Sequence, residues 1–507
     1  MTMRDPFSKP FCQPEDLGLA IPDSDHAVSM CLPRWCDVIG YEEGDPEVIE
    51  TFECGYPRFL LHPIVSELFL AAQQEFAKKD EVAIVFPSLA AAWRCADYVK
   101  RRKETSCRLE SYGWGDLTVL LLNEEAYDIA WKCWQHGGEI VSSRLAESAL
   151  TDEPLDAAVA EAGEKASLRL KERLASFHEG VSSEDVFLFS SGMAAIFAVH
   201  RLLLTRKPEA PTIQVEFPYL DSFKMQEEFG EGGVIDYSMT TSGGLDEISR
   251  WFESGGEAAG VYTELPSNPL LKTADLQRVA DILRAQEVPF IVDDTVATSV
   301  NVNGFLFADV LTTSLTKLFS GAGDVAAGAV ILNPESPFYS VLKDDLGLEE
   351  AASPLFIRDA IVLEINSRHF EERVRATNEN GRELFDWLSE RPEIESIWHP
   401  LTCCRENYDA VRRADGGYGA LFSMRLKADQ EAVARFYDAL EISKGPSLGT
   451  DFSLVCPYTL LAHYHELDWA GERGAARDLI RVWIGLEDPE DLIGRLERAF
   501  EAMKTLK

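Results

Sequence analysis

Lys317 stands in a run of small and hydroxylated residues, TTSLTKLFSGAGD, over positions 312–324. A partly buried lysine loses its proton more readily than an exposed one, as an amine that forms a Schiff base must. Ser314 and Thr316 add hydroxyl groups near it that could bind a phosphate. The apolar strand expected next, over 326–333, disfavours an exposed surface loop. The run therefore indicates a covalent site for a phosphate-bearing aldehyde.

Two acidic residues follow a buried apolar strand in the sequence IVDDT, at 291–295. A carboxylate at such a place is costly unless it has a charged partner. The ring nitrogen of pyridoxal phosphate is such a partner, and an acid there keeps the ring protonated as an electron sink. We take Asp293 as the candidate and Asp294 as the alternative, while a strand-end Asp that only caps the next turn is common.

A third feature is the junction SSGM between an apolar strand and a helix. Gly192 lets the backbone approach a ligand closely. The amides of Gly192 and Met193 open the helix, where unpaired N–H groups and the dipole favour a phosphate. Alone this is weak, because many strand-to-helix turns carry Ser and Gly merely for capping.

The elements around these residues predict where the three features meet. Apolar strands alternate with helices from about residue 185, which is typical of a mostly parallel sheet covered on both faces. Ligands of such sheets bind at the carboxyl ends of the strands. The strands expected here cover 186–192, 212–217, 258–265, 289–294 and 326–333. The three features fall at strand ends and are expected to form one site.

We divide the chain into three segments. Residues 1–180 form an N-terminal arm and extension, whose first fifty residues are expected to be irregular. Residues 181–356 form the large ligand-binding domain. Residues 357–507 contain a long bridging helix over 357–390 and a smaller C-terminal α/β domain.

Composition restricts the partners. The formal charge of −38 gives a surface that repels phosphate backbones and anionic lipid, which disfavours nucleic-acid and membrane partners. The ten cysteines show no CxxC pair and no spacing typical of zinc, so no metal site is predicted. Without a secretory signal or a long apolar run, a cytoplasmic enzyme with small-molecule substrates is expected.

Taken together, the motifs resemble fold-type I pyridoxal-phosphate (PLP) enzymes, specifically the cystathionine γ-synthase family of Cys/Met metabolism. The segments that carry the resemblance are GYPRFLLHP, SSGMAAI, ELPSNPLLKTADL, IVDDT, TTSLTKLFSGAGDVAAG, GPSLGTDFSL and LIRVWIGLEDPEDL. YPRF with CPYTLLAHYHELDWA is most similar to the fungal branch. The resemblance implies a PLP-dependent transferase fold with a mostly parallel sheet of the seven-stranded type.

The resemblance implies roles for individual residues at the cofactor. Lys317 would carry PLP as a Schiff base, Asp293 would pair with the ring nitrogen, and Tyr219 would stack on the ring and assist proton transfer. Phosphate contacts would come from Gly192, Met193, Ser314 and Thr316. In the family a Tyr-x-Arg motif, here Tyr56 and Arg58, reaches the phosphate from a neighbouring subunit. That arrangement would require at least a dimer with shared active sites, and family members are usually tetramers.

Other positions bear on the substrate. Arg481 matches the arginine that holds the α-carboxylate, and Asn268 and Ser447 match residues of the same pocket. Where the family reads YGGTxR this chain reads YLDSFK, so Leu220 and Asp221 replace two glycines and Lys224 replaces the arginine. Ala322 stands where the family has a histidine. These departures leave open how the distal end of the substrate is held.

The implied reaction is γ-replacement on an O-acylhomoserine with cysteine as the nucleophile, which is the cystathionine γ-synthase step of trans-sulfuration and methionine biosynthesis. Two related alternatives are a γ-substitution with a carbon nucleophile in fungal secondary metabolism and a γ- or β-lyase. A non-catalytic homologue is disfavoured because Lys317, Asp293, Tyr219 and Arg481 are all present.

Overall fold

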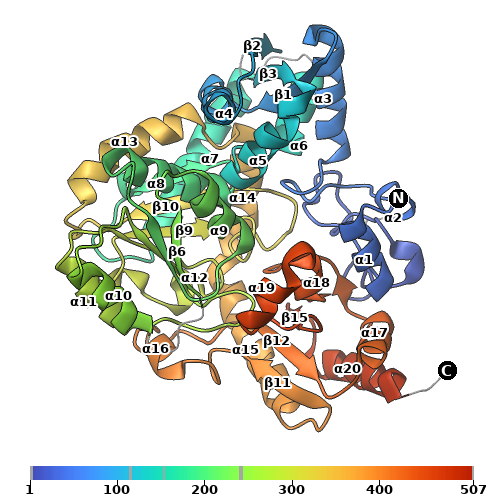
Figure 1. The fold of residues 1–507 in the computed structure, drawn as a ribbon. Helices are drawn as coiled ribbons and strands as arrows, with labels where there is room; N and C mark the ends of the chain where they lie inside the picture. The colour runs from blue at the N-terminus through green and yellow to red at the C-terminus, as the bar shows by residue number, and fades with distance from the viewer. Residues whose placement is uncertain (1–3, 114–116, 152–154, 239–243, 505–507) are drawn as a thin grey trace.

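A seven-stranded sheet forms the centre of the protein (Figure 1). The computed structural model describes residues 4–113, 117–151, 155–238 and 244–504. The strand order is β4-β10-β9-β8-β7-β5-β6, and every neighbouring pair is parallel except the two that involve β10. The strands are β4 (Val186–Phe189), β5 (Thr212–Val215), β6 (Val234–Tyr237), β7 (Val261–Glu264), β8 (Phe290–Asp293), β9 (Val310–Ser314) and β10 (Gly328–Leu332). The predicted mostly parallel sheet is confirmed, with β6 and β9 in addition to the expected strands.

Helices cover both faces of this sheet, as its sequence predicts. Along β10, Ala329 and Ile331 pack into one buried cluster, while Val330 and Leu332 pack into another. Because successive side chains of a strand point to opposite faces, both faces must be covered by apolar partners. The helices of this part are α7 (Ala157–Ala175), α8 (Gly192–Arg206), α9 (Leu220–Glu228), α10 (Gly244–Glu253), α11 (Leu276–Arg284), α12 (Thr298–Asn301), α13 (Tyr339–Ala352) and α14 (Ile357–Asn366). α7 packs against β4 and α14, so the large unit begins before residue 181.

A second, smaller sheet lies in the C-terminal part. Its order is β11-β12-β15-β14-β13, with β11 (Ile394–Trp398), β12 (Leu421–Leu426), β13 (Ser443–Lys444), β14 (Leu454–Cys456) and β15 (Ile480–Trp483). Its helices are α16 (Arg405–Asp409), α17 (Gln430–Ala439), α18 (Tyr458–Ala462), α19 (Leu467–Glu472) and α20 (Pro489–Lys504).

The bridging helix expected over 357–390 is interrupted. α14 ends at Asn366, a 3-10 turn covers Ser367–His369, and α15 (Phe370–Ser389) continues the path. The Ser367 hydroxyl donates to the carbonyl of Leu363 at 2.7 Å, and Arg373 donates to the carbonyl of Asn366 at 2.7 Å. Side chains that bond to helix carbonyls in this way bend or end helices, and the prediction of one continuous helix was wrong here.

Residues 63–150 form an N-terminal domain with a core of its own, drawn at the top of Figure 1. It contains an antiparallel sheet of order β1-β3-β2, with β1 (Glu81–Phe86), β2 (Cys107–Tyr112) and β3 (Leu117–Asn123). Its helices are α3 (Pro63–Phe76), α4 (Leu89–Arg102), α5 (Tyr127–Gly137) and α6 (Ser143–Leu150). Two apolar strands of this domain, β1 and β3, are visible in its sequence, whereas β2 and α5 are not.

Residues 4–34 are largely irregular, as the sequence suggests, apart from the 3-10 turn Pro14–Asp16. The helices α1 (Trp35–Glu43) and α2 (Pro46–Ile49) follow, and this arm packs against the C-terminal sheet of the same chain. The buried amine of Lys444 donates to the carbonyls of Cys12 and Pro33, and the Tyr437 hydroxyl donates to the carbonyl of Leu32 at 2.8 Å. The order of this arm depends on partners about 400 residues away, which local periodicity cannot reveal.

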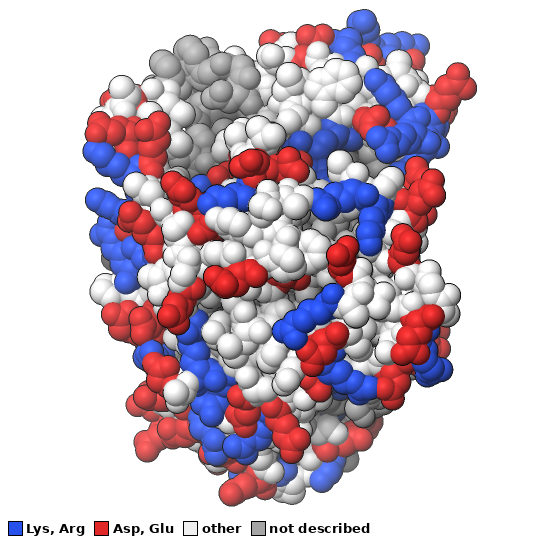
Figure 2. All heavy atoms as spheres, turned by 90° about the vertical axis from the view of Figure 1, so that its left-hand side faces the viewer, with Lys and Arg blue, Asp and Glu red and all other residues white. Residues whose placement is uncertain are grey.

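Acidic and basic side chains are interspersed over the face drawn in Figure 2. The charge excess of −38 is thus not gathered into one acidic patch on that face. Within the described ranges, every helix is too short or too polar to traverse a bilayer.

Candidate active site

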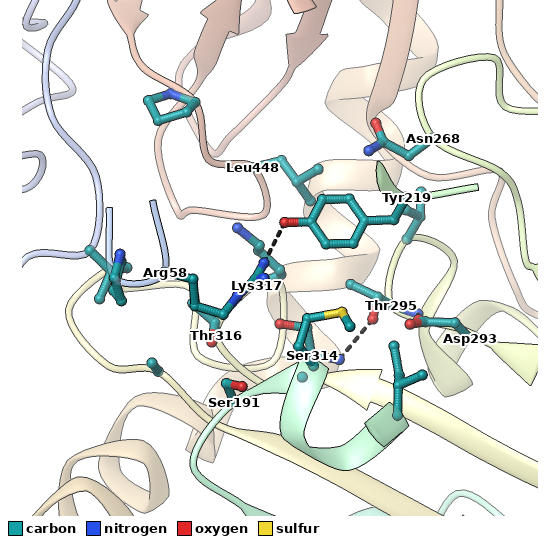
Figure 3. Close-up of a pocket in the computed structure, with 18 of the residues that line it drawn as sticks. Arg58, Ser191, Tyr219, Asn268, Asp293, Thr295, Ser314, Thr316, Lys317 and Leu448 are labelled. Atoms are coloured by element: carbon teal, nitrogen blue, oxygen red, sulfur yellow. Dashed lines mark hydrogen bonds between the residues drawn. The ribbon is translucent and has the colours of Figure 1, made fainter. Parts of the chain in front are cut away.

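A cavity lies at the carboxyl ends of β8 and β9, beside the start of α8 (Figure 3). Nearly all the predicted site residues line it, although they come from all three segments of the chain. They are Tyr56, Arg58, Gly192, Met193, Tyr219, Asn268, Asp293, Ser314, Thr316, Lys317 and Arg481. Ser447, the remaining predicted residue, contacts the cavity through Lys317.

Lys317 presents its amine to this cavity from the turn that follows β9. Its Nζ donates to the hydroxyl of Ser447 at 3.0 Å and lies 5.9 Å from the centre of the Tyr56 ring. Burial lowers the pKa of Lys317 to about 7, and the charges of Arg481 and Arg58 act in the same direction. A lysine in this state holds a large fraction of reactive free amine at neutral pH.

Asp293 ends β8 and faces the cavity. Its Oδ1 accepts from the amide of Thr295 at 2.9 Å, and burial raises its pKa to about 6. Within the described residues no Lys or Arg forms an ion pair with it, so a cation supplied by a ligand would stabilise its charged form. Asp294, in contrast, does not line the cavity. Its carboxylate accepts from the Ser299 hydroxyl at 2.6 Å.

A second acid, Glu264, lies beside Asp293 because the two residues are paired across β7 and β8. Burial raises the pKa of Glu264 to about 8, and the charge of Asp293 adds to the effect. Glu264 accepts from the backbone amides of Tyr219 and Asn268. It thereby fixes two segments of the cavity wall.

The turn before α8 forms an anion-binding cradle. Ser191 caps the helix by accepting from the amide of Ala194 at 3.0 Å, which leaves the first helical amides, of Gly192 and Met193, directed past the helix end. A Cβ on Gly192 would lie 2.9 Å from the Cβ of Ser314, so only glycine fits between the two segments. The amide of Ser314 in turn donates to the Thr295 hydroxyl at 2.7 Å (Figure 3).

Thr316 is held differently from Ser314. Its hydroxyl accepts from the amide of Ala327 at 3.0 Å and donates to the carbonyl of the same residue at 3.3 Å. Thr316 therefore links the lysine turn to β10 as well as lining the cavity.

Arg481, on β15, closes the cavity from the C-terminal sheet. Its guanidinium donates to the Asn268 side-chain oxygen at 3.2 Å and to the carbonyls of Pro446 and Ser447 at 2.6 and 3.1 Å. All three acceptors are uncharged, so in the described structure its positive charge stays available for an anionic ligand. Asn268 is itself fixed, because its amide group donates to the Tyr458 hydroxyl at 3.3 Å.

Tyr56 and Arg58 line the cavity of their own chain. The Arg58 guanidinium donates to the Asp221 carboxylate at 2.6 Å and to the Tyr219 hydroxyl. In the single chain described, the arm that carries them contacts this cavity and the C-terminal sheet. The expectation that a dimer shares its active sites through Tyr56 and Arg58 stays a prediction.

Lys224 does not take the place of the family's arginine in this cavity. Its amine pairs with Glu227 at 3.0 Å and with Glu466 at 3.3 Å, and these partners raise its pKa against the effect of burial. Of the altered segment, Asp221 is the residue that enters the site, through Arg58.

Sequence reasoning did not select several residues that shape the cavity. Ser191 and Thr295 belong to motifs that were recognised, so their hydroxyls could have been added to the candidates. Tyr458 lies in the segment typical of the fungal branch, whereas His136 of α5 carries no recognisable signal. The contact of His136 with Asp221, at 2.7 Å, becomes visible only in the folded chain.

The residues fit PLP as a resident group. One cavity contains a lysine amine of lowered pKa, a buried acid that has no cationic partner among the described residues, and a helix N-terminus that a ligand can approach closely because Gly192 has no side chain. These match the aldehyde, the ring nitrogen and the phosphate of that molecule. Fold and site together define a PLP-dependent enzyme of fold type I.

The comparison with protein families agrees. A model described as "Cys/Met metabolism PLP-dependent enzyme" matches residues 162–501, and one described as "Fungal trans-sulfuration enzyme, N-terminal domain" matches residues 64–142. The chain belongs to the family of Cys/Met metabolism PLP-dependent enzymes. Enzymes of this family act on small amino-acid substrates and typically oligomerise.

Individual relatives extend over nearly the whole chain. A cystathionine gamma-synthase of Neurospora crassa is 32% identical, covering 96% of this chain and 98% of its own. The cystathionine gamma-synthase-like protein ankD of Aspergillus thermomutatus is 33% identical, covering 98% and 96%. A solved structure, cystathionine gamma synthase from Xanthomonas oryzae, superposes with a TM-score of 0.59 at 23% identity, covering 68% of this chain and 87% of that one. This last likeness shows the fold.

Proposed function

We propose that the protein is a PLP-dependent transferase that replaces the γ-substituent of an O-acylhomoserine with the sulfur of cysteine, as a cystathionine γ-synthase. The observation that carries the proposal is that the amine of Lys317, the carboxyl of Asp293 and the guanidinium of Arg481 face one cavity. Named cystathionine gamma-synthases of Neurospora crassa and Saccharomyces cerevisiae, at 32% and 30% identity over at least 95% of this chain, support the choice of reaction.

Arg481 binds the α-carboxylate of the amino-acid substrate in this proposal. Its contacts with Asn268 and with the carbonyls of Pro446 and Ser447 hold the guanidinium in place without neutralising it. A planar guanidinium binds a carboxylate through two parallel hydrogen bonds. The substrate is thus oriented with its Cα toward Lys317.

Lys317 moves the protons. When bound, PLP supplies an electron sink that acidifies the Cα–H bond of the substrate. The Nζ of Lys317, neutral above about pH 7, accepts the proton from Cα. Nζ would pass this proton to the bound cofactor and, neutral again, accept a second proton from Cβ, so that the γ-substituent leaves with its bonding electrons as a carboxylate. The cysteine sulfur, after loss of its proton, then adds at Cγ, and Nζ returns one proton each to Cβ and Cα. Ser447, 3.0 Å from Nζ, keeps the amine directed into the cavity between these transfers.

Asp293 and Tyr219 hold the reacting system in place. Asp293, as an ionised acid, stabilises positive charge on the ring nitrogen, and this pairing would lower its raised pKa. The Tyr219 hydroxyl is fixed by Arg58 and by Asp221, with 3.1 Å to the latter. Its ring is therefore available for stacking, and its hydroxyl lies near the path of proton transfer.

A second cavity bears on the identity of the nucleophile. It has a volume of about 440 Å³ and shares Tyr56, Phe59, Tyr219, Pro446 and Arg481 with the first cavity. Its other walls are rich in aromatic and apolar side chains, namely Tyr41, Ile49, Leu60, Tyr458, Leu461 and Tyr464. We assign this cavity to the second substrate because it adjoins the first at Tyr219 and Arg481.

The charges of this second cavity favour a second candidate function. Among the described residues that line it, Arg481 is the only Lys or Arg, and we assign that guanidinium to the carboxylate of the first substrate. Burial raises the pKa of Glu42, another wall residue, to about 8. A nucleophile without a carboxylate of its own fits such walls, which supports a related γ-substitution with a neutral carbon nucleophile.

Product analysis tests the proposal. The holoenzyme is incubated with O-acetylhomoserine and cysteine, and the mixture is analysed by mass spectrometry for cystathionine and acetate, with Lys317→Ala as the blank. Cystathionine and acetate in equal amounts are expected. Acetate release that depends on a neutral carbon acceptor, with no cystathionine, would instead establish the second candidate. Keto acid and ammonia formed without any acceptor would identify a lyase.

A further inference from the structure

The C-terminal end of α5, in the N-terminal domain, lies against the active-site cavity. The carbonyl of Gln135 accepts from Arg58 at 3.1 Å, and the ring Nδ1 of His136 is 2.7 Å from Oδ1 of Asp221. The carbonyl of Gly138 accepts from the Ser191 hydroxyl at 2.7 Å. One turn of α5 and the residue after it thus contact both Arg58 and the turn that opens α8.

Asp221 is the centre of these contacts. It is fully buried, and its two oxygens accept from different partners, His136 on Oδ1 and Arg58 on Oδ2. The Tyr219 hydroxyl approaches Oδ2 at 3.1 Å. Burial by itself would raise the pKa of Asp221, but Arg58 and His136 bring it down to about 2. An ionised carboxylate only accepts hydrogen bonds, so the His136 Nδ1 carries the proton and donates.

These contacts determine how Arg58 can act. Of the five N–H groups of its guanidinium, three donate to the Gln135 carbonyl, to Asp221 and to the Tyr219 hydroxyl. Its other two N–H groups have no hydrogen-bond acceptor among the described residues, and the side chain lines the cavity, so a ligand can accept from them. Buried charge-assisted hydrogen bonds of this kind fix both the position and the plane of a guanidinium.

We propose that α5 makes the N-terminal domain a functional part of the active site, with His136 and Asp221 as positioning residues that hold Arg58 and Tyr219 at the cavity. The inference rests on the proposed function in one respect, namely that Arg58 faces bound PLP. It gives the N-terminal domain a role in the chemistry besides packing.

The test of this proposal removes the N–H donor of His136. His136→Leu fills similar space without an N–H group, whereas His136→Asn keeps a donor near the position of Nδ1. We expect the dissociation constant of PLP, measured by loss of cofactor from the holoenzyme on dilution, to rise about 10-fold or more in His136→Leu and in Asp221→Asn. His136→Asn should restore most of the affinity. A merely structural role would not distinguish Leu from Asn.

The matched control lies elsewhere in the same interface. The Tyr98 hydroxyl, on α4, donates to Glu228 at 3.1 Å and joins the N-terminal domain to α9 without contacting the cavity. Tyr98→Phe should lower the melting temperature to an extent similar to His136→Leu and leave the dissociation constant of PLP unchanged. Equal loss of cofactor in Tyr98→Phe and His136→Leu would overturn the assignment.

Native affinity for PLP in His136→Leu and Asp221→Asn would remove the inference while the γ-replacement reaction stands. Absence of γ-replacement in the native protein would remove the proposed function, while the affinity measurements still decide the role of His136.

Discussion

The amine of Lys317 lies 3.0 Å from the hydroxyl of Ser447, although 130 residues separate them in the chain. Lys317 follows a strand of the large sheet, and Ser447 belongs to the loop PSLG that connects β13 and β14 of the small sheet. A Cβ on Gly449 in this loop would lie 2.5 Å from the amide of Leu318. The two domains therefore meet directly at the residue expected to carry the chemistry.

Borohydride reduction followed by peptide mapping should place the cofactor on Lys317. Lys444 is the natural internal control, because it is also buried and burial lowers its pKa to about 8. Its amine, however, is held by the carbonyls of Cys12, Pro33 and Asp438. We expect the label on Lys317 alone and a loss of turnover of at least about 1,000-fold in Lys317→Ala. A label on Lys444 would contradict the assignment.

The capture of PLP should depend on pH through Lys317. Only the unprotonated amine attacks an aldehyde, and the pKa of Lys317 is lowered to about 7, by burial first and by Arg481 and Arg58 after that. The capture rate should therefore rise as pH increases toward about 7 and then level off, as stopped-flow absorbance of the cofactor-free protein would show. An exposed lysine would instead give a rate that keeps rising toward pH 10.5, its ordinary pKa.

The same experiment on Arg481→Met checks the cause of the shift. Removal of a positive charge that disfavours the protonated amine raises the pKa of Lys317, so the midpoint of the profile should move to higher pH. A midpoint that moves to lower pH, or a rate without any midpoint near neutrality, would show that another group controls the capture.

Substitution of the two acids of IVDDT should affect different properties, namely catalysis for Asp293 and stability for Asp294. Asp293 lines the cavity without a cationic partner in the described chain, whereas Asp294 is bonded to Ser299 at 2.6 Å and faces away. We expect Asp293→Asn to lower kcat by about 100-fold or more, in the range for loss of a charge-stabilising group. Asp294→Asn should lower the free energy of unfolding by about 1–3 kcal/mol and change kcat little. Steady-state kinetics and denaturant unfolding of both variants decide between the two acids.

The central residues of the site could be predicted from the sequence because each belongs to a short local motif. Asp293 ends a buried strand, Lys317 and Gly192 stand three residues beyond the ends of two others, and ligands bind where such strand ends come together. The contacts of the N-terminal arm could not be predicted in the same way. The positions of Tyr56 and Arg58 depend on how the arm packs against Tyr437 and Lys444, and no local pattern encodes that packing.

Some elements of the N-terminal domain were harder to predict from the sequence, for a different reason. β2 reads CRLESY, and its residues are only partly buried or exposed, so it shows no apolar run. α5 contains His136, whose partner Asp221 lies 85 residues further on. From the sequence, Asp221 was recognised only as a departure from a glycine. The role of a buried carboxylate can be inferred only when its guanidinium partner is known.

Gly138 offers a test of how closely the N-terminal domain approaches the phosphate-binding turn. It ends α5 with a φ of 70°, and a Cβ there would lie 2.5 Å from the Cβ of Met193 and 2.7 Å from the Ser191 hydroxyl oxygen. Gly138→Ala should therefore push the N-terminus of α8 out of position and raise the dissociation constant of PLP by about 10-fold or more. Gly44→Ala is the matched control, because Gly44 ends α1 with a φ of 73° and nothing within 4 Å. Both variants share the cost of a left-handed alanine, about 1 kcal/mol, so both should unfold slightly more easily, but only Gly138→Ala should lose cofactor. Equal affinity for PLP in the two variants would mean that α5 contacts this turn without controlling its shape.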